Sequence, residues 1–81
     1  MMTTALRWIF VRNGRALTCE VSVNGSQCYD VSVVPHWDVA STAIEAYPSP
    51  SKALRRHAEL SSSFRDAGWK LVRTADDQAA A

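Results

Sequence analysis

Apolar and polar residues alternate along the first half of the chain, and two Asn-Gly pairs interrupt the alternation. Alternation with a period of two is typical of strands that bury one face, and Asn-Gly favours the type I′ turn of a tight hairpin. The segments and the pairs between them are 6–12, Asn13-Gly14, 15–23, Asn24-Gly25 and 28–34. This half of the chain therefore predicts a meander of three antiparallel strands.

The first Asn-Gly turn sets the register of the first hairpin. With a two-residue loop, Arg12 pairs with Arg15, and each further pair lies one step outward along both strands. This register gathers the apolar residues on one face and sets Arg7 opposite Glu20 on the other, as a cross-strand ion pair. The apolar residues on the first face are Leu6, Trp8, Phe10, Leu17, Cys19 and Val21.

The second hairpin requires a different loop. A two-residue loop at Asn24-Gly25 would place Asp30 opposite Cys19 in the core, because a one-residue change of register exchanges the two faces. A three-residue loop with a glycine bulge brings the apolar residues of both strands to one face. We expect this longer loop, and the sequence leaves its register open by two residues.

Both cysteines lie in this second hairpin. The alternation points Cys19 into the core and Cys28 to the opposite face. A disulfide requires Cβ atoms that point toward each other, so we expect two unbridged thiols.

The second half of the chain predicts a fourth strand and a helix. Pro35 ends the third strand, and segment 41–47 alternates weakly, as an outer strand does. Ser49 and Pro50 are typical of a helix start, and Gly68 is typical of the residue that follows a helix end. The expected helix, 50–67, has an apolar stripe that consists of Ala53, Leu54, His57, Leu60, Ser61, Phe64 and Ala67.

These elements predict an α+β fold, in which an antiparallel meander of three to four strands is followed by one C-terminal α-helix packed on one sheet face. Trp69, directly after the helix stop, is expected to pack on Phe64. Segment 70–74 stays open between a loop and a short edge strand. Residues 1–74 form one expected domain, and the tail 75–81 has nothing to bury and is expected to be disordered.

Composition changes this picture little. The 81 residues carry a net charge of +1 and are 47% hydrophobic. A charge this small creates no strong field that would gather nucleic acid or membrane. The apolar run near the start is too short to cross a bilayer, so we expect a cytoplasmic protein with reduced cysteines. A chain of this size buries only about 60–65% of its unfolded surface, which favours a partner that completes the core.

The residues that carry chemistry form neither a catalytic nor a metal-binding pattern. The cysteines and histidines lack the close pairing of a zinc site, and the glycines of the sheet are turn residues rather than a phosphate loop. His57 and Glu59 are two apart on the helix and point to different sides. We therefore expect no enzyme, no cofactor and no metal, and we interpret His57 as a hydrogen-bonded histidine at the edge of the core.

The outward face of the sheet is the first candidate binding surface. One helix covers only one face, so the other face is left half apolar, and such a face is typical of a contact surface. The candidate partner surface consists of Ile9, Val11, Cys28 and Val34. We expect a small binding module that forms a homodimer through this face, with another protein as the alternative partner.

Arginines and a loop tryptophan indicate a second function, weak binding of single-stranded nucleic acid. Arginines neutralise phosphates, and an exposed tryptophan stacks on a base. The candidate contacts are Arg7, Arg12, Arg15 and Trp37. Two structural alternatives stay open: Trp37 as a plug over one end of the core, and the helix cations as a solvated face with Arg55 paired to Glu59. An enzyme of unknown type is the third hypothesis.

Three short motifs carry a resemblance to small uncharacterised bacterial proteins of ββββα order. They are Trp8 in the first strand, the run 17–20 (Leu-Thr-Cys-Glu) in the second, and the run 67–69 (Ala-Gly-Trp) at the helix end. The resemblance implies the architecture and brings no activity or site residue. The order of elements over residues 6–69 is also similar to that of the Whirly and positive-cofactor-four class of single-stranded-DNA-binding proteins, which implies a dimer of the same unit.

Overall fold

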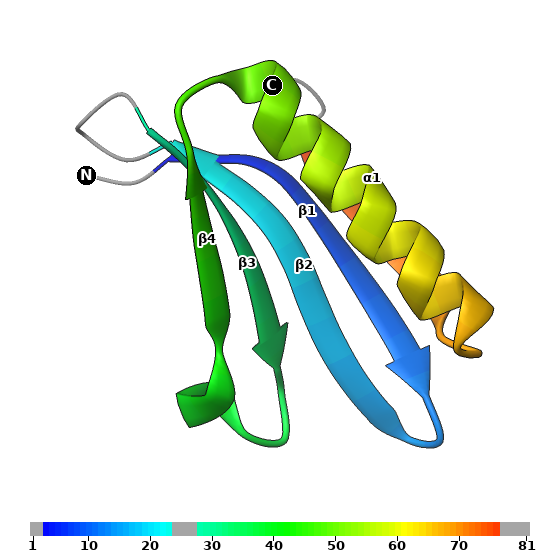
Figure 1. Ribbon diagram of the computed structural model, residues 1–81. Helices are drawn as coiled ribbons and strands as arrows, with labels where there is room; N and C mark the ends of the chain where they lie inside the picture. The colour runs from blue at the N-terminus through cyan, green and yellow to red at the C-terminus, as the bar shows by residue number, and fades with distance from the viewer. Residues whose placement is uncertain (1–2, 24–27, 77–81) are drawn as a thin grey trace.

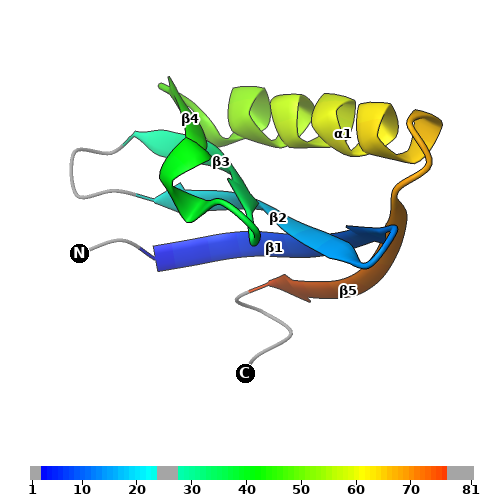
Figure 2. The ribbon, with the colours of Figure 1, turned by 90° about the horizontal axis from the view of Figure 1, so that it is seen from below.

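The computed structural model describes residues 3–23 and 28–76 and confirms the α+β fold class. A five-stranded antiparallel sheet, in the order β4-β3-β2-β1-β5, carries one helix on one of its faces (Figures 1 and 2). The elements are β1 (Thr3–Arg12), β2 (Arg15–Val23), β3 (Tyr29–Pro35), the short 3₁₀ helix η1 (Val39–Ser41), β4 (Ala43–Tyr47), α1 (Pro50–Asp66) and β5 (Lys70–Asp76).

The first hairpin has the predicted register. Arg12 pairs with Arg15 and Trp8 pairs with Cys19. Asn13 and Gly14 both have positive φ, at 51° and 76°, as the central residues of a type I′ turn require.

The second hairpin has the predicted parity. Cys19 pairs with Val33 and Val23 pairs with Tyr29, which puts the apolar residues of β2 and β3 on one face. This is one of the two registers that the sequence left open. The predicted three-residue glycine-bulge loop falls on residues 24–27, which lie outside the described residues.

The sheet is wider than the predicted three to four strands, because segment 70–76 pairs with the first strand. Phe10 pairs with Leu71 and Val11 with Lys70, and the register shifts by a bulge farther along the pair. The strand that the sequence left undecided therefore covers the edge of β1. β5 reaches Asp76, two residues past the expected end of the domain, and the rest of the predicted tail, 77–81, lies outside the described residues.

The predicted caps position the helix. The Ser49 side chain accepts a hydrogen bond from the Lys52 backbone N–H at 3.4 Å, and Pro50 opens the first turn. At the other end, the Trp69 N–H donates to the Phe64 carbonyl at 2.9 Å, and the Gly68 N–H donates to the Arg65 carbonyl at 3.0 Å. This pair of bonds, with Gly68 at φ 97°, is a Schellman motif.

The core lies between α1 and the inner face of β1, β2 and β3. Its buried hydrophobic residues are Phe10, Leu17, Cys19, Val21, Val31 and Ala53. On the helix, burial follows Ala53, His57 and Ser61 at four-residue spacing. The predicted stripe was too broad: Leu54 is 48% exposed and Ala67 is exposed. Successive helical residues are about 100° apart, so Leu54 lies on the flank once the small Ala53 faces the sheet.

Cys19 lies in the core, as the alternation predicted, whereas Cys28 precedes the paired residues of β3, so its place on the opposite face stays a prediction. Cys19 is fully buried beneath the helix, whereas Cys28 is partly exposed immediately before β3. Both are free thiols.

Candidate functional site

Four chain segments meet at one end of the sheet. They are the β1–β2 turn, the segment that follows β3, the end of α1 and the start of β5. Pairing of Leu17 with Pro35, and of Val11 with Lys70, aligns these segments beside the turn residue Asn13. The side chains that gather here define what we call the Arg–Trp end: Arg12, Asn13, Arg15, Trp37, Trp69 and Lys70.

Two tryptophans form the aromatic part of the Arg–Trp end. The rings of Trp37 and Trp69 are stacked, with centroids 6.0 Å apart and planes 13° apart. Trp69 in turn makes an edge contact with Phe64 at 6.5 Å. Trp37 is thus both attached to the core and 48% exposed. The predicted stop of the helix places Trp69 where it supports Trp37.

Bonds to β2 fix the loop that carries Trp37. The His36 N–H donates to the Ala16 carbonyl at 3.0 Å, which continues the β2–β3 ladder past Pro35. The His36 Nε2 lies 2.7 Å from the Thr18 hydroxyl. Because these two bonds fix His36, the next residue, Trp37, lies at a defined position.

Cations line the space around this stack. The Arg15 guanidinium lies 5.2 Å from the centre of the Trp37 ring. A hollow of about 350 Å³ is lined by Arg12, Asn13, Arg15 and the two stacked tryptophans. A second hollow of about 350 Å³ lies on the other side of Arg12 and includes Lys70. Among the described residues, the charged side chains that line both hollows are all cations.

The structure brings together three of the four predicted nucleic-acid contacts. Arg12, Arg15 and Trp37 share the Arg–Trp end, and within the described part of the chain no ion pair involves either arginine. Arg7 lies apart, in the middle of the sheet, where its Nε donates to Glu20 at 3.0 Å as the register predicted. Its charge is already compensated there.

Sequence reasoning missed Trp69 and Lys70 as site residues. The sequence predicts a core contact for Trp69, whereas in the structure the residue is only partly buried. The signal that was available is the Gly-Trp-Lys run, which puts an aromatic ring and a cation together at an element boundary.

The outer sheet face collects three of the four residues of the predicted partner surface. Ile9, Val11 and Val34 are each partly exposed on the face opposite α1, and Ile9 and Val34 both pair with Thr18. Cys28 precedes β3 and stands outside the paired residues of the sheet. Ile44 of β4, which the sequence reading did not include, extends this face and is 62% exposed.

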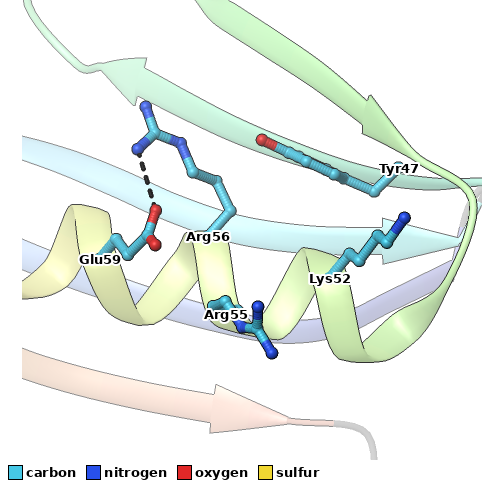
Figure 3. A pocket seen from close by; sticks show the side chains of 5 residues that line it. All are labelled: Tyr47, Lys52, Arg55, Arg56 and Glu59. Carbon is cyan, nitrogen blue, oxygen red and sulfur yellow. Dashed lines mark hydrogen bonds and ion pairs between the residues drawn. The ribbon is translucent and has the colours of Figure 1, made fainter.

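A third hollow, of about 260 Å³, lies between the helix and β4 (Figure 3). Its lining residues are Tyr47, Lys52, Arg55, Arg56 and Glu59. Arg56 donates to Glu45 at 2.9 Å and to Glu59 at 3.3 Å, so Glu59 pairs with Arg56 and not with Arg55 as the sequence suggested. Because both carboxylates neutralise Arg56, this hollow is a weaker anion site than the Arg–Trp end.

The buried histidine and cysteine have unreactive environments. The His57 Nε2–H donates to the Cys19 carbonyl at 3.1 Å, and burial lowers the pKa of His57. Burial also raises the pKa of the Cys19 thiol to about 12, which keeps it protonated at neutral pH. His57 is therefore the hydrogen-bonded core histidine that the sequence predicted.

Among residues 3–23 and 28–76, no group of three or more potential ligands comes together as a metal site would require. In the same part of the chain, α1 falls short of the length and apolarity of a membrane span, and no other helix reaches them.

No protein-family model, curated protein or solved structure matches the chain. The resemblance drawn from the sequence therefore stays a prediction.

Proposed function

We propose that the protein is a non-enzymatic binding module that binds single-stranded nucleic acid at the Arg–Trp end. The observation that carries the proposal is the half-exposed Trp37, whose ring stacks with Trp69 and has the Arg15 guanidinium over it. A fixed aromatic plane beside uncompensated guanidinium groups is the combination that single-strand-binding surfaces use.

Each part of the Arg–Trp end has a distinct role in this proposal. Trp37 offers a plane for one base, and stacking on such a plane contributes about 1–3 kcal/mol per base. Arg12 and Arg15 neutralise phosphates on either side of that base. The contact with Trp69 holds Trp37 in place before binding, so less side-chain entropy is lost when the base arrives.

The ligand is expected to be recognised with little sequence preference. Stacking accepts every base, and arginine contacts to phosphate carry no sequence information. The net charge of +1 supplies little long-range attraction, so affinity should be modest and sensitive to salt. The proposal includes a cytoplasmic location, in which both free thiols stay reduced.

The test is a titration of fluorescently labelled oligo-dT by fluorescence anisotropy at two salt concentrations. We expect Trp37→Ala to weaken binding about 5- to 150-fold, which is the loss of about 1–3 kcal/mol of stacking. Trp37→Phe keeps an aromatic plane and should retain more of the affinity. Arg15→Gln should lower the slope of log K against log salt by about 0.7, the value for one phosphate on a single strand.

Arg55→Gln provides the matched control. Arg55 is exposed on α1, lies away from the Arg–Trp end and points away from Tyr47 and Arg56 in Figure 3, yet its substitution changes the net charge as Arg15→Gln does. If Arg15→Gln and Arg55→Gln lose the same affinity for oligo-dT, the effect depends on net charge alone, and the proposed site is refuted. Absence of binding by the unmodified protein at low salt would refute nucleic acid as the ligand.

A further inference from the structure

On the outer sheet face, the cations and the carboxylates lie on opposite sides. The cations that share this face lie on the β1–β5 side, where Arg7, Lys70 and Arg73 face outward with Val11 and Ile9. The carboxylates lie on the β2–β3 side, where Glu20 pairs with Arg7 and Asp30 pairs with Ser22. The boundary between the positive and negative halves runs along the strands, between β1 and β2.

Apolar residues straddle the same boundary. Val11 pairs with Ala16 across it, and Ile9 is followed on the far side of Thr18 by Val34. The Arg7–Glu20 pair lies two residues farther along the strands. The face thus has an apolar part near the Arg–Trp end and a charged part beyond it.

From this layout we infer that the outer sheet face binds a second copy of the chain, through a two-fold axis that runs parallel to the strands between β1 and β2. A rotation about such an axis lays β1 of one copy over β2 of the other. Arg7 of each copy then faces Glu20 of the other, and the Ile9 and Val11 region of each copy covers Ala16 and the hydrogen-bonded Thr18–His36 pair of the other. The result is an aligned sheet-on-sheet packing with an isologous interface.

Charge complementarity selects this orientation over the alternative. A two-fold axis that crosses the strands would lay β1 on β1, so that Arg7 would approach the cations of the other copy. Like charges brought together in an interface oppose association, whereas the axis along the strands places opposite charges together. The face is therefore self-complementary in one of the two arrangements.

The inferred axis has a geometric consequence for ligand binding. Rotation about an axis parallel to the strands leaves each strand end at the same end of the assembly. The two Arg–Trp ends would then lie at one end of the dimer, on either side of the interface. If the proposed function holds, one nucleic-acid strand that reached both would gain from the high effective concentration of the second site.

Oligomeric state without nucleic acid tests the inference independently of the proposed function. We expect the unmodified protein to sediment as a dimer in the micromolar range. Ile9→Glu should give a folded monomer, because association would remove the new carboxylate from water and replace the apolar contact that Ile9 makes. Ile44→Glu is the matched control: it places the same charge on the same face, but β4 lies beyond the strands that overlap, and the dimer should persist. A monomeric parent protein, or dissociation by Ile44→Glu alone, would overturn the inference.

A charge exchange tests the orientation and does not depend on Ile9. Arg7→Glu or Glu20→Arg alone would set like charges against each other within and between copies and should weaken the dimer at least tenfold. The double variant restores opposite charges in both places and should recover the dimer. Urea unfolding of each variant separates loss of association from loss of fold. Failure of the double variant to recover a dimer, when it is folded, would reject the two-fold axis along the strands.

Discussion

At the scale of single residues, the core contains a titratable group that must stay neutral. His57 is 2% exposed, donates to the Cys19 carbonyl and lies with its ring edge-on to Trp8 at 5.0 Å. A protonated imidazole in this position would carry a buried charge with no carboxylate partner among the described residues. Neutral His57 is therefore a condition of the folded state.

This condition predicts a pH dependence of stability. Burial lowers the pKa of His57 below its ordinary value of 6.5, so the unfolded chain takes up a proton first as the pH falls. The contribution of His57 to stability is complete above pH 6.5 and is lost as the pH falls below 6.5 toward the folded-state pKa. Between pH 7.5 and 5.5, the free energy of unfolding measured in urea should fall by about 1 kcal/mol more for the parent protein than for His57→Gln.

A matched substitution separates this effect from the titration of carboxylates. The His57→Gln variant keeps every carboxylate of the parent protein, so the loss of stability that both share measures the titration of the carboxylates. If His57→Gln and the parent lose stability equally between the two pH values, the buried imidazole is not the titrating group.

At the scale of elements, the end of α1 contributes both to the stability of the fold and to the Arg–Trp end. Gly68 has φ 97°, a conformation that L-residues avoid, and the two hydrogen bonds of the Schellman motif require it. A Cβ on Gly68 would also lie 3.3 Å from the Arg12 Nε. Gly68→Ala should therefore cost about 1–2 kcal/mol of unfolding free energy, measured by urea denaturation.

The exposed helical residue Ser62 provides the comparison for this substitution. Ser62→Ala introduces the same residue, alanine, at a position with helical φ and should be neutral or slightly stabilising. A cost below about 0.3 kcal/mol for Gly68→Ala would show that the helix end tolerates an ordinary residue.

The sequence predicts an element well where neighbouring residues determine it, and poorly where residues far apart in the chain do. Asn13-Gly14 fixes both turn type and register, so the pairs from Arg12–Arg15 to Leu6–Val21 could be derived, whereas the bulge beyond Leu6, which shifts the remaining pairs, could not. The wider pairing of β5 with β1 depends on residues far apart in the chain, such as Leu71 and Phe10, and no local pattern encodes it. The number of strands was therefore underestimated although the fold class was correct.

The candidate site was predictable only in part for the same reason. Arg12, Arg15 and Trp37 stand out in the sequence as exposed cations and a loop aromatic. Their convergence with Trp69 required knowledge that the end of α1 and the end of β3 lie at one edge of the sheet. Arg7 is the opposite case. In the sequence it looks equivalent to Arg12 and Arg15, but its ion pair with Glu20 compensates its charge.

At the scale of the whole molecule, the sheet separates the two proposed binding surfaces. α1 and the core occupy one face, the inferred dimer surface occupies the other, and the Arg–Trp end lies where the strands stop (Figure 2). A ligand at the Arg–Trp end therefore leaves the outer face accessible, and association of two copies leaves Trp37 accessible.

The pairing of β1 with β5 also predicts that the protein folds when its chain is opened at a different point. Leu6 lies opposite Asp76, so the start of the first strand and the end of the last are neighbours at one corner of the sheet. A short Gly-Ser linker in place of residues 77–81 could join these two strands, and new ends could be made in η1, whose residues are all exposed. We expect this circular permutant to unfold cooperatively in urea with the same strand pairing, as circular dichroism and amide exchange would measure. An unfolded permutant would show instead that the sheet can be built only in its present chain order.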